Sequence, residues 1–408
     1  MYKLFIIGLL STLLITACKP ETSTTDKDTK KDTVSTTDSL AKIEKPKSTE
    51  LIDYQGKVVE INPVYNDFAR YIAYLDVENP QYDSLKKYSF WQRDKKQADS
   101  IWQNLEEKRF SKMRTFAQSE ISEFLSSPKQ VLYPFSGPDF INAFTLYPNA
   151  QTITMMALEP VGSISNFSTK SKSFTEEYLY HLNMAVNDLY KKSYFITQHM
   201  GGHLQQHRAN GTLPLLTMFI VRAGNKILNV RKVTVDSTGN YTLDSLKYTK
   251  ESRPRAVRID FVNEKNPTEV KSVFYFQADI TDPGLNKKKG LIPFLKAQQN
   301  CVGYFKSASY CCFDPIFTQI KTTMLDKCDL IVQDDTGIPY RDYSPSKWNI
   351  NLYGMYEKPV RDFGSYTYQK DLDKVYHDST VVKKPMNFSL GYHWQTKVQN
   401  IMIFKKKK

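Results

Sequence analysis

Residues 329–340 combine a buried strand with a turn, and this combination constrains the fold more than any other stretch. Leu330 to Val332 are consecutive apolar residues, which is typical of a strand covered on both faces. The Asp334-Asp335-Thr336-Gly337 segment that follows is made of turn residues. The stretch therefore predicts an α/β fold with Asp334 and Asp335 at a strand end, where open α/β sheets bind ligands.

A strand–turn–helix–strand unit is predicted between residues 130 and 160. The pattern gives a short strand at 130–135, a Gly137-Pro138 turn, a brief helix, and a second strand at 152–158 that ends at Glu159. This order resembles the first half of a Rossmann-type nucleotide fold, such as a methyltransferase, which implies that Gly137 faces a cofactor and Glu159 the ribose hydroxyls. The unit has no Gly-x-Gly, and Asp139 stands where an anionic ligand group would lie. We therefore predict the topology without a cofactor.

Helical and strand patterns fill the rest of the chain after residue 50. Helices are expected at 95–127, at two places within 172–208, at 285–299 and at 315–327. Strands are expected at 215–221, 226–235, 241–248, 256–262 and 272–278. Short turns between these strands favour an antiparallel meander. The predicted fold is a mixed α/β sheet with a Rossmann-like βαβαβ start, an antiparallel extension and helices on its faces.

The N-terminal residues predict a secreted, lipid-anchored protein. Lys3 precedes an apolar segment at 4–15 that is too short to span a membrane. Ile15-Thr16-Ala17-Cys18 resembles the lipobox of bacterial lipoproteins, which implies acylation of Cys18 and attachment to a lipid bilayer. Lys19, which is not Asp, favours the outer membrane by analogy with Gram-negative sorting. We expect the protein to face the periplasm or the cell surface.

The composition divides the chain into a signal peptide, a tether and a folded part. Residues 19–50 consist almost wholly of charged and small polar residues and proline, which cannot form a core. We expect a signal peptide at 1–17, a tether at 18–50 and a basic tail at 405–408. One domain is expected at 51–404, with a helical part at 51–127 and a sheet-bearing part at 128–404.

The net charge is +13, but the Lys and Arg residues are scattered apart from the run at 405–408. A secreted lipoprotein seldom meets DNA, so we expect no nucleic-acid partner. Seven tripeptides of Asp, then Ser or Thr, then an apolar residue or Thr resemble the O-glycosylation site of Bacteroidota envelope proteins. They begin at Asp32, Asp38, Asp83, Asp99, Asp236, Asp244 and Asp378.

Metal and disulfide chemistry have weak support. His199, His203 and His207 are spaced to share a helix face, which is a metal-ligand pattern, but Gly201-Gly202 weaken that helix and a polar face is the favoured interpretation. We therefore expect no metal. The four cysteines after Cys18 are Cys301, Cys311, Cys312 and Cys328. A disulfide between Cys301 and Cys328 is left open, because spacing alone does not establish it.

Carboxylates at predicted strand ends provide the candidate chemistry. Ser136, Asp139, Asp334 and Asp335 are the catalytic candidates, and Gly137, Glu159 and Asp334 are the candidate ligand contacts. A carboxylate pair drawn from Asp139, Glu159, Asp334 and Asp335 would suit glycoside cleavage. Asp335-Thr336-Gly337 matches the core of aspartic proteases, but its flanking residues do not. Between the adjacent carboxylates, we expect Asp335 to cap the turn and Asp334 to face the ligand.

Several motifs resemble a family of uncharacterised bacterial lipoproteins and secreted proteins. They are Tyr133–Asp139, Leu158–Gly162, Lys306–Tyr310, Gln333–Tyr340 and Tyr353-Gly354. The resemblance covers about residues 130–404 and implies localisation and a one-unit architecture, not a reaction.

Three functions are therefore weighed. A binding or structural role toward an envelope glycan or another envelope ligand is expected first. Trp348 and Tyr353 are its aromatic contacts if they are exposed, whereas a place in the core is the favoured interpretation of this aromatic segment. The alternatives are a carboxylate-dependent hydrolase or transferase that acts on envelope glycan and a degenerate Rossmann-type nucleotide-binding transferase.

Overall fold

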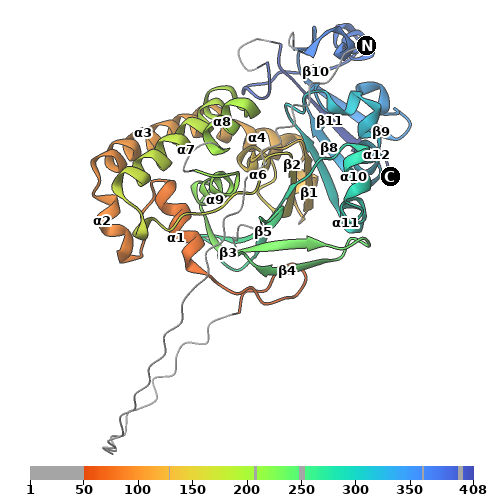
Figure 1. Ribbon diagram of the computed structural model, residues 1–408. Helices are drawn as coiled ribbons and strands as arrows, with labels where there is room; N and C mark the ends of the chain where they lie inside the picture. Colours follow the sequence, from red (N-terminus) through yellow and green to blue (C-terminus); the bar gives the residue numbers. More distant parts are fainter. Residues whose placement is uncertain (1–49, 128, 206–208, 248–252, 361–362, 394–397) are drawn as a thin grey trace, which may run out of the picture. The chain divides into compact units, whose positions relative to one another are not determined.

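A mixed sheet of eleven strands runs through the part of the chain that the structure describes (Figure 1). The computed structural model describes residues 50–127, 129–205, 209–247, 253–360, 363–393 and 398–408. These described residues form one compact unit. The signal peptide, Cys18 and nearly all of the expected tether lie outside the described residues.

The strands have the following bounds. They are β1 (Lys129–Pro134), β2 (Ala150–Ala157), β3 (Asn225–Val235), β4 (Tyr241–Ser245), β5 (Ala256–Asn263), β6 (Lys271–Gln277), β7 (Cys301–Phe305), β8 (Cys328–Gln333), β9 (Trp348–Gly354), β10 (Lys383–Lys384) and β11 (Asn400–Lys406).

The α-helices, and one π-helical turn at Glu106–Phe110, have the following bounds. They are α1 (Pro63–Ile72), α2 (Asp83–Lys86), α3 (Ser89–Leu105), α4 (Ser111–Glu120), α5 (Ser122–Leu125), α6 (Phe140–Leu146), α7 (Lys172–Lys192), α8 (Thr197–Gln205), α9 (Leu213–Arg222), α10 (Asp282–Lys287), α11 (Leu291–Ala297), α12 (Thr318–Lys327) and α13 (Lys370–His377).

The order of the strands is β10-β9-β11-β8-β7-β1-β2-β6-β5-β3-β4. Within it, β8, β7, β1, β2 and β6 are parallel neighbours. From β6 the chain crosses to the other side of β1, where it forms β7, so the direction of strand addition reverses between β1 and β7. This is the order of nucleotide-binding doubly wound folds, and it makes the carboxyl ends of β1 and β7 a topological switch point. The predicted mixed α/β class is confirmed.

Antiparallel strands extend the parallel block on both sides. On one side β11 runs antiparallel to both β8 and β9. On the other side β5 pairs with β6, β3 with β5, and β4 with β3, all antiparallel. The antiparallel extension is therefore present, but β3 lies between β5 and β4, so its strands are not arranged in chain order.

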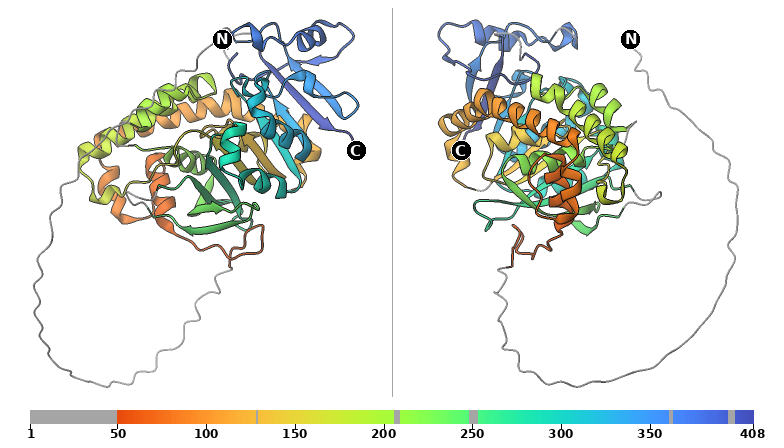
Figure 2. Two further views of the ribbon diagram at one scale, coloured as in Figure 1. Left: turned by 45° about the vertical axis from the view of Figure 1, so that its right-hand side comes forward. Right: turned by 90° about the vertical axis from the view of Figure 1, so that its left-hand side faces the viewer.

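Helices cover both faces of the sheet, and β1 shows how its residues divide between them. Val131 and Tyr133 belong to a core that includes residues of α1, α6, α7 and α9. Leu132 points to the other face and belongs to a core that includes residues of α10, α11, α12 and α13. This alternation is the period-two pattern of a strand. In Figure 2, α3 in orange and α7 in yellow-green lie along each other on the first of these faces.

Several elements differ from the sequence-based expectation, and the helix expected at 285–299 is the pair α10 and α11. The segment expected as a strand at 215–221 is helix α9, whose residues from Leu213 to Val221 are all buried. A helix that is apolar all round shows no 3.6-residue period, so a run of this kind resembles a buried strand. Strand β7 was not predicted because Gly303 weakens its pattern. Lys405 and Lys406, expected in a basic tail, belong to β11.

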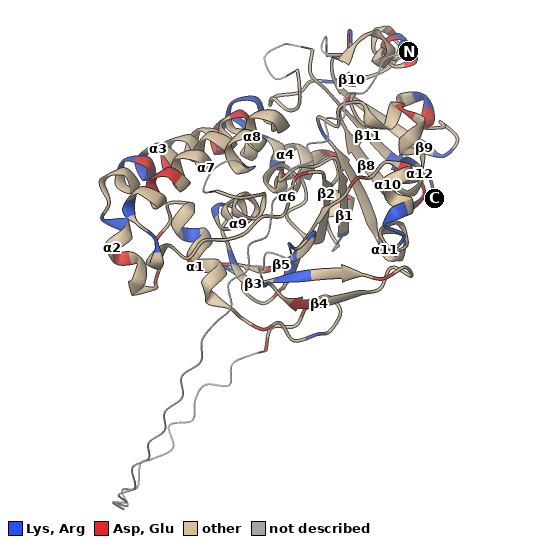
Figure 3. Ribbon diagram, in the orientation of Figure 1, with Lys and Arg blue, Asp and Glu red and all other residues tan. Residues whose placement is uncertain are grey.

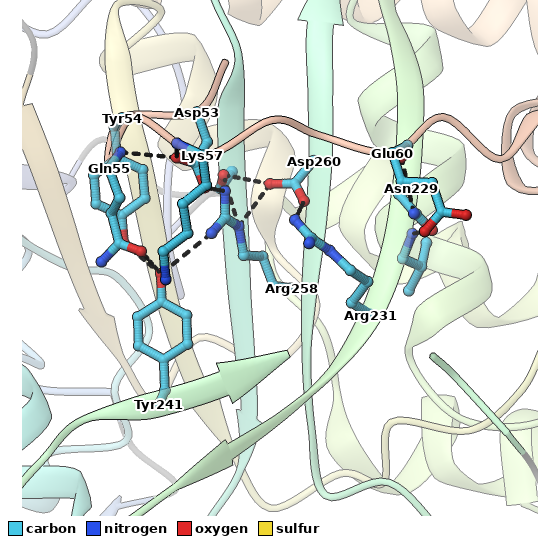
Figure 4. Close-up of polar contacts among 12 residues, drawn as sticks. Asp53, Tyr54, Gln55, Lys57, Glu60, Asn229, Arg231, Tyr241, Arg258 and Asp260 are labelled. Carbon is cyan, nitrogen blue, oxygen red and sulfur yellow. Dashed lines mark hydrogen bonds and ion pairs between the residues drawn. The ribbon is translucent and has the colours of Figure 1, made fainter. Parts of the chain in front are cut away.

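A buried charge cluster fixes the first described residues to the antiparallel extension (Figure 4). Arg258 on β5 donates from Nη2 to Asp53 at 2.7 Å and from Nε to Asp260 at 2.6 Å. Arg231 on β3 donates to the other oxygen of Asp260 at 2.7 Å. Arg258 and Asp260 are fully buried, and the cluster balances two guanidinium groups with two carboxylates. Balanced, hydrogen-bonded charge of this kind can be buried without a net unpaired ion.

Gly162 provides a test of close backbone packing, because its backbone lies against that of Asn210 and Gly211. Gly162 has φ +74°, and a Cβ atom there would lie 1.9 Å from the carbonyl oxygen of Asn210. Gly56 has a similar φ of +77° with nothing within 4 Å of its Cβ position. We expect Gly56→Ala to lower the free energy of unfolding by about 1 kcal/mol, the cost of the left-handed conformation. Gly162→Ala should cost about 3 kcal/mol or more, because the clash adds to that cost.

Urea unfolding of both variants measures the difference, with Gly56→Ala as the control for φ alone. Equal losses in the two variants would show that the Asn210 backbone moves aside at little cost.

Candidate functional site

A cavity of about 240 Å³ lies at the carboxyl ends of β1, β2, β6 and β7. Its walls come from the loops that follow these strands, together with the α7–α8 connection and Tyr392. It therefore lies at the topological switch point of the parallel block. Four of the residues singled out from the sequence, Ser136, Gly137, Asp139 and Glu159, line this one cavity.

A buried ion pair forms part of the cavity wall. Lys306, directly after β7, places Nζ 2.7 Å from Asp139 Oδ2, and both side chains are 2 % exposed. Asp139 also accepts hydrogen bonds from Tyr133 Oη at 2.9 Å and from Asn142 Nδ2 at 2.8 Å. Burial lowers the pKa of Lys306, and Asp139 partly offsets this effect. The pair joins the loop after β1 to the loop after β7.

Glu159 and Ser307 present polar atoms to the cavity. Glu159 directly follows the exposed Leu158 after β2, and its Oε1 accepts a hydrogen bond from Thr197 at 3.2 Å. Ser307 Oγ is buried and has no hydrogen-bond partner among the described residues. Ser136 Oγ donates locally, with the carbonyl of Gly137 at 2.9 Å as its nearest acceptor. An unpartnered buried hydroxyl at a cavity suggests a place for a ligand group, because such groups are otherwise paired.

Aromatic rings line the rest of the cavity. Phe135 and Phe317 pack edge to face with ring centroids 5.3 Å apart. Tyr194 and Tyr392 do the same at 4.7 Å. Phe195 also lines the cavity. Such rings favour a ligand with a flat apolar part.

The backbone around the cavity is strained. Among the described residues, seven that are not glycine have positive φ, and Phe135, Ser307 and Ser309 of these line the cavity. Two more of the seven, Ser193 and Tyr310, lie next to the cavity. The carbonyl oxygen of Ser193 accepts hydrogen bonds from Lys306 Nζ and Asn142 Nδ2, and Tyr310 directly follows Ser309 in the loop after β7. Each such residue costs about 1–3 kcal/mol, and this strain concentrates at ligand sites.

Asp334 and Asp335 are buried beside the cavity and do not line it. Asp334 accepts the backbone N–H of Ser307 at 2.9 Å and of Thr336 at 3.0 Å. Asp335 accepts hydrogen bonds from Tyr310 Oη at 2.6 Å and from Asn400 Nδ2 at 3.1 Å. The expectation for the cap is reversed, because Asp334 makes the backbone contacts. Strand alternation could not show that the loop after β7 supplies the N–H group that Asp334 binds.

The aromatic candidates Trp348 and Tyr353 are core residues of β9. They are 4 % and 1 % exposed, and neither lines the cavity. The Tyr353 hydroxyl donates to Glu120, and Trp348 packs against Tyr343. Their role in ligand contact depended on exposure, which the structure does not give them.

The histidine residues do not form a metal centre in the described part of the chain. His199 is exposed and bonds Asp188 at 2.8 Å, whereas His203 pairs with His181 of α7 at 3.0 Å. His207 lies outside the described residues. Cys301, Cys311, Cys312 and Cys328 are free thiols, although Cys301 and Cys328 are in register on β7 and β8.

The hydroxyl residues of the Asp-Ser tripeptides in the described chain are all exposed: Ser84, Ser100, Ser237, Ser245 and Ser379. The tripeptides at Asp32 and Asp38 lie outside the described residues. None of the described helices is both long enough and apolar enough to cross a membrane.

Several cavity residues were not identified as site residues from the sequence. Lys306 follows a strand that was not predicted, and its partner Asp139 is distant in the chain. Asp279 and Thr281 line the cavity directly after β6, a strand that was predicted, so its polar end was an available signal. Tyr194 and Tyr392 come from loops that only the fold brings together. No family model matches the chain, and no curated protein is detectably similar to it.

Two Asp-x-Thr-Gly turns allow a matched test of burial. Asp334 Oδ1 and Asp236 Oδ1 each accept the N–H and hydroxyl of the Thr two residues later. Burial, and then the Asp335 charge, raise the pKa of Asp334 to about 6 from an ordinary 3.8. The pKa of the exposed Asp236 is lowered, first by its hydrogen bond from Thr238.

We expect opposite pH dependence for the two alanine variants. Between about pH 4 and 6, folded Asp334 binds more protons than unfolded Asp334, so its contribution to stability falls as the pH rises. The destabilisation by Asp334→Ala should therefore be larger at pH 4 than at pH 7, by on the order of 2 kcal/mol. The contribution of Asp236 should instead be lost as the pH falls below its unfolded pKa.

Urea unfolding from pH 3 to 7 of the wild type, Asp334→Ala and Asp236→Ala gives these differences. A cost of Asp334→Ala that grows with pH would show that this carboxyl is stabilised in its charged form.

Proposed function

We propose that this chain is an envelope lipoprotein whose folded unit binds a nucleoside-like ligand, a small molecule with a flat ring and neighbouring hydroxyls. The observation that carries the proposal is the position of the cavity at the topological switch point, where doubly wound sheets bind their ligands. The strained residues Phe135, Ser307 and Ser309 and the unpartnered Ser307 hydroxyl support it.

The lining residues match the two parts of such a ligand. Phe135, Phe195 and Phe317 are rings against which a base can pack. Glu159 follows the second strand of the βαβ unit, the position from which an acidic side chain binds ribose hydroxyls in this fold. A phosphate group is disfavoured in the loop after β1, because Pro138 offers no N–H and Asp139 adds negative charge.

The carboxylates do not support a glycoside hydrolase. Of the four considered, Asp334 and Asp335 do not line the cavity, and Asp139 is held by Lys306. The other acidic residues of the lining are Glu159 and Asp279, and Asp279 accepts the N–H and the hydroxyl of Thr281 in a local turn. Glycoside cleavage uses two acidic groups, and no second carboxylate among the described lining residues lacks such a partner. Binding therefore fits the site better than hydrolysis.

Attachment to the outer membrane through acylated Cys18 is part of the proposal. It rests on the lipobox-like Ile15–Cys18, on Lys19, and on the resemblance to uncharacterised bacterial lipoproteins. The protein then holds its cavity in the periplasm or at the cell surface.

A second candidate is a transferase that carries its nucleoside-containing donor in the same cavity. The β6-β2-β1-β7-β8 order favours it, because it extends the resemblance of β1-α6-β2 to a Rossmann-type fold such as a methyltransferase. A group donor consumed on incubation with envelope extract would support this second candidate.

Glu159→Gln tests the proposed diol contact. A carboxylate accepts from both hydroxyls of a ribose, and an amide replaces one acceptor with a donor. We expect adenosine to bind Glu159→Gln about ten-fold more weakly than the wild type, the loss of a charged hydrogen bond. Binding of 2′,3′-dideoxyadenosine should be the same in both proteins, as measured by isothermal titration calorimetry.

Glu176→Gln is the control, because Glu176 is exposed on α7 and does not line the cavity. Wild-type binding of a neutral glucan oligosaccharide in preference to adenosine would replace the nucleoside with a glycan. Equal loss of adenosine and dideoxyadenosine in Glu159→Gln would contradict the diol contact.

Cys18→Ser tests the anchor. Without the thiol no acyl chain can be attached, and each buried methylene contributes about 0.8 kcal/mol to membrane binding. We expect the variant to lose labelling by a radioactive fatty acid and to move to the soluble fraction. Cys311→Ser, which changes another cysteine, should keep both the label and the membrane association. Membrane association of Cys18→Ser equal to that of the wild type would refute the anchor.

A further inference from the structure

A second hollow differs from the cavity in its charge, because the charged residues that line it are all Lys or Arg. This groove of about 580 Å³ lies between the β3–β4 hairpin, the start of β5, the end of β6 and the α10–α11 connection. Its charged lining residues are Lys232, Arg253, Arg255, Lys287, Lys288 and Lys289, and the described residues that line it include no Asp or Glu. We name these six residues the basic groove. Figure 3 shows Lys and Arg on β3 and near α10 and α11.

The charges of the basic groove are not neutralised within the described protein. None of its six side chains forms an ion pair with a described residue, whereas Lys and Arg elsewhere on the surface often do. Lys288 donates to the carbonyl of Gln277 at 2.5 Å, a neutral acceptor. Burial and the neighbouring Arg255 lower the pKa of Lys288, with Asp279 acting against them. Like charges gathered without partners repel one another, and an anionic ligand removes that repulsion.

The groove lacks the features that other polyanions need. Single-stranded nucleic acids stack their bases on exposed rings, but the aromatic residue that lines this groove, Phe276, is 6 % exposed. A membrane surface is bound by apolar side chains that insert beside basic ones. None of the large exposed apolar residues of the described chain lines the groove. The groove therefore fits a polymer ligand that is recognised by its charge and held in a hollow.

We propose that the basic groove binds an acidic glycan, a polysaccharide whose carboxylate or phosphate groups pair with Arg255, Lys288 and their neighbours. Arginine forms bidentate pairs with such groups, and lysine contributes point charges. The proposal does not depend on the ligand of the cavity, although Ala278 lines both hollows. It assigns a partner to positive charge that the fold gathers from three separate segments of the chain.

The test uses polygalacturonate oligomers as the carboxylate probe, a phosphorylated mannan fragment as the phosphate probe, and neutral dextran of the same length. We expect one or both acidic probes, and not dextran, to bind the purified chain at low ionic strength. Binding should weaken as salt is added, because salt screens exposed charges. In Arg255→Glu/Lys289→Glu it should weaken by about ten-fold, since two favourable charges become repulsive.

Lys112→Glu/Lys347→Glu is the matched control. It makes the same change in net charge at two exposed lysines that line none of the hollows described above. Adenosine binding by both double variants reports on the cavity separately. Should Arg255→Glu/Lys289→Glu fail to fold, Lys287→Gln/Lys289→Gln removes two charges without reversing them and should weaken binding in the same direction.

Three results would overturn the proposal. Equal loss in the control variant would show attraction by net charge alone. Tighter binding of an oligothymidylate, or of vesicles that contain phosphatidylglycerol, than of either acidic glycan would assign the groove to a nucleic acid or to a membrane. Absence of binding to both acidic probes at low ionic strength would leave the groove without the proposed partner.

Discussion

The ion pair between Lys306 and Asp139 holds together the loops after β1 and β7, the two strands between which the direction of strand addition reverses. Lys306 follows β7, Asp139 follows β1, and their charged atoms are 2.7 Å apart with almost no exposure. Asn142 and Tyr133 bind the same carboxylate, and Ser193 at the end of α7 accepts from both Lys306 and Asn142. Loss of one partner of such a pair leaves a lone buried charge, at a cost of about 3–5 kcal/mol. The cavity walls can bear strained backbone because this network determines where the loops lie.

The sequence was informative where a local signal marks both ends of an element. The β1 strand and α6 flank Gly137-Pro138, and β8 ends at a turn, so their types and the polar residues after them could be predicted. Strand β7 has Gly303 at its centre and helix α9 is apolar all round, so neither shows a period. The pairing of Asp139 with Lys306 depends on contacts between distant segments. The individual strand ends were therefore predictable, but the side chains that meet there were not.

The turns at Asp236 and Asp334 separate what a motif determines from what its surroundings determine. Both sequences have Asp, then Thr two residues later, then Gly, and both form the same hydrogen bonds to that Thr. One turn lies at the surface between β3 and β4, and the other is buried after β8. The motif sets the geometry in both cases, whereas burial and a neighbouring carboxylate set the protonation of Asp334. The geometry of the turn could therefore be predicted from the local sequence, whereas the protonation of Asp334 could not.

The contact between Arg258 and Asp53 has a mechanical meaning. Asp53 lies close to the point where the described chain begins. The fully buried side chain of Arg258 on β5 holds it by an ion pair. A pull on the chain ahead of Leu51 is therefore delivered to the antiparallel extension. In the sheet, β5 pairs directly with β6, whose carboxyl end leads into the cavity, while β6 and β2 both stand between β5 and β1. The residue that takes such a load is therefore separated by two strands from β1, whose following loop is joined to the loop after β7 by the Lys306–Asp139 ion pair.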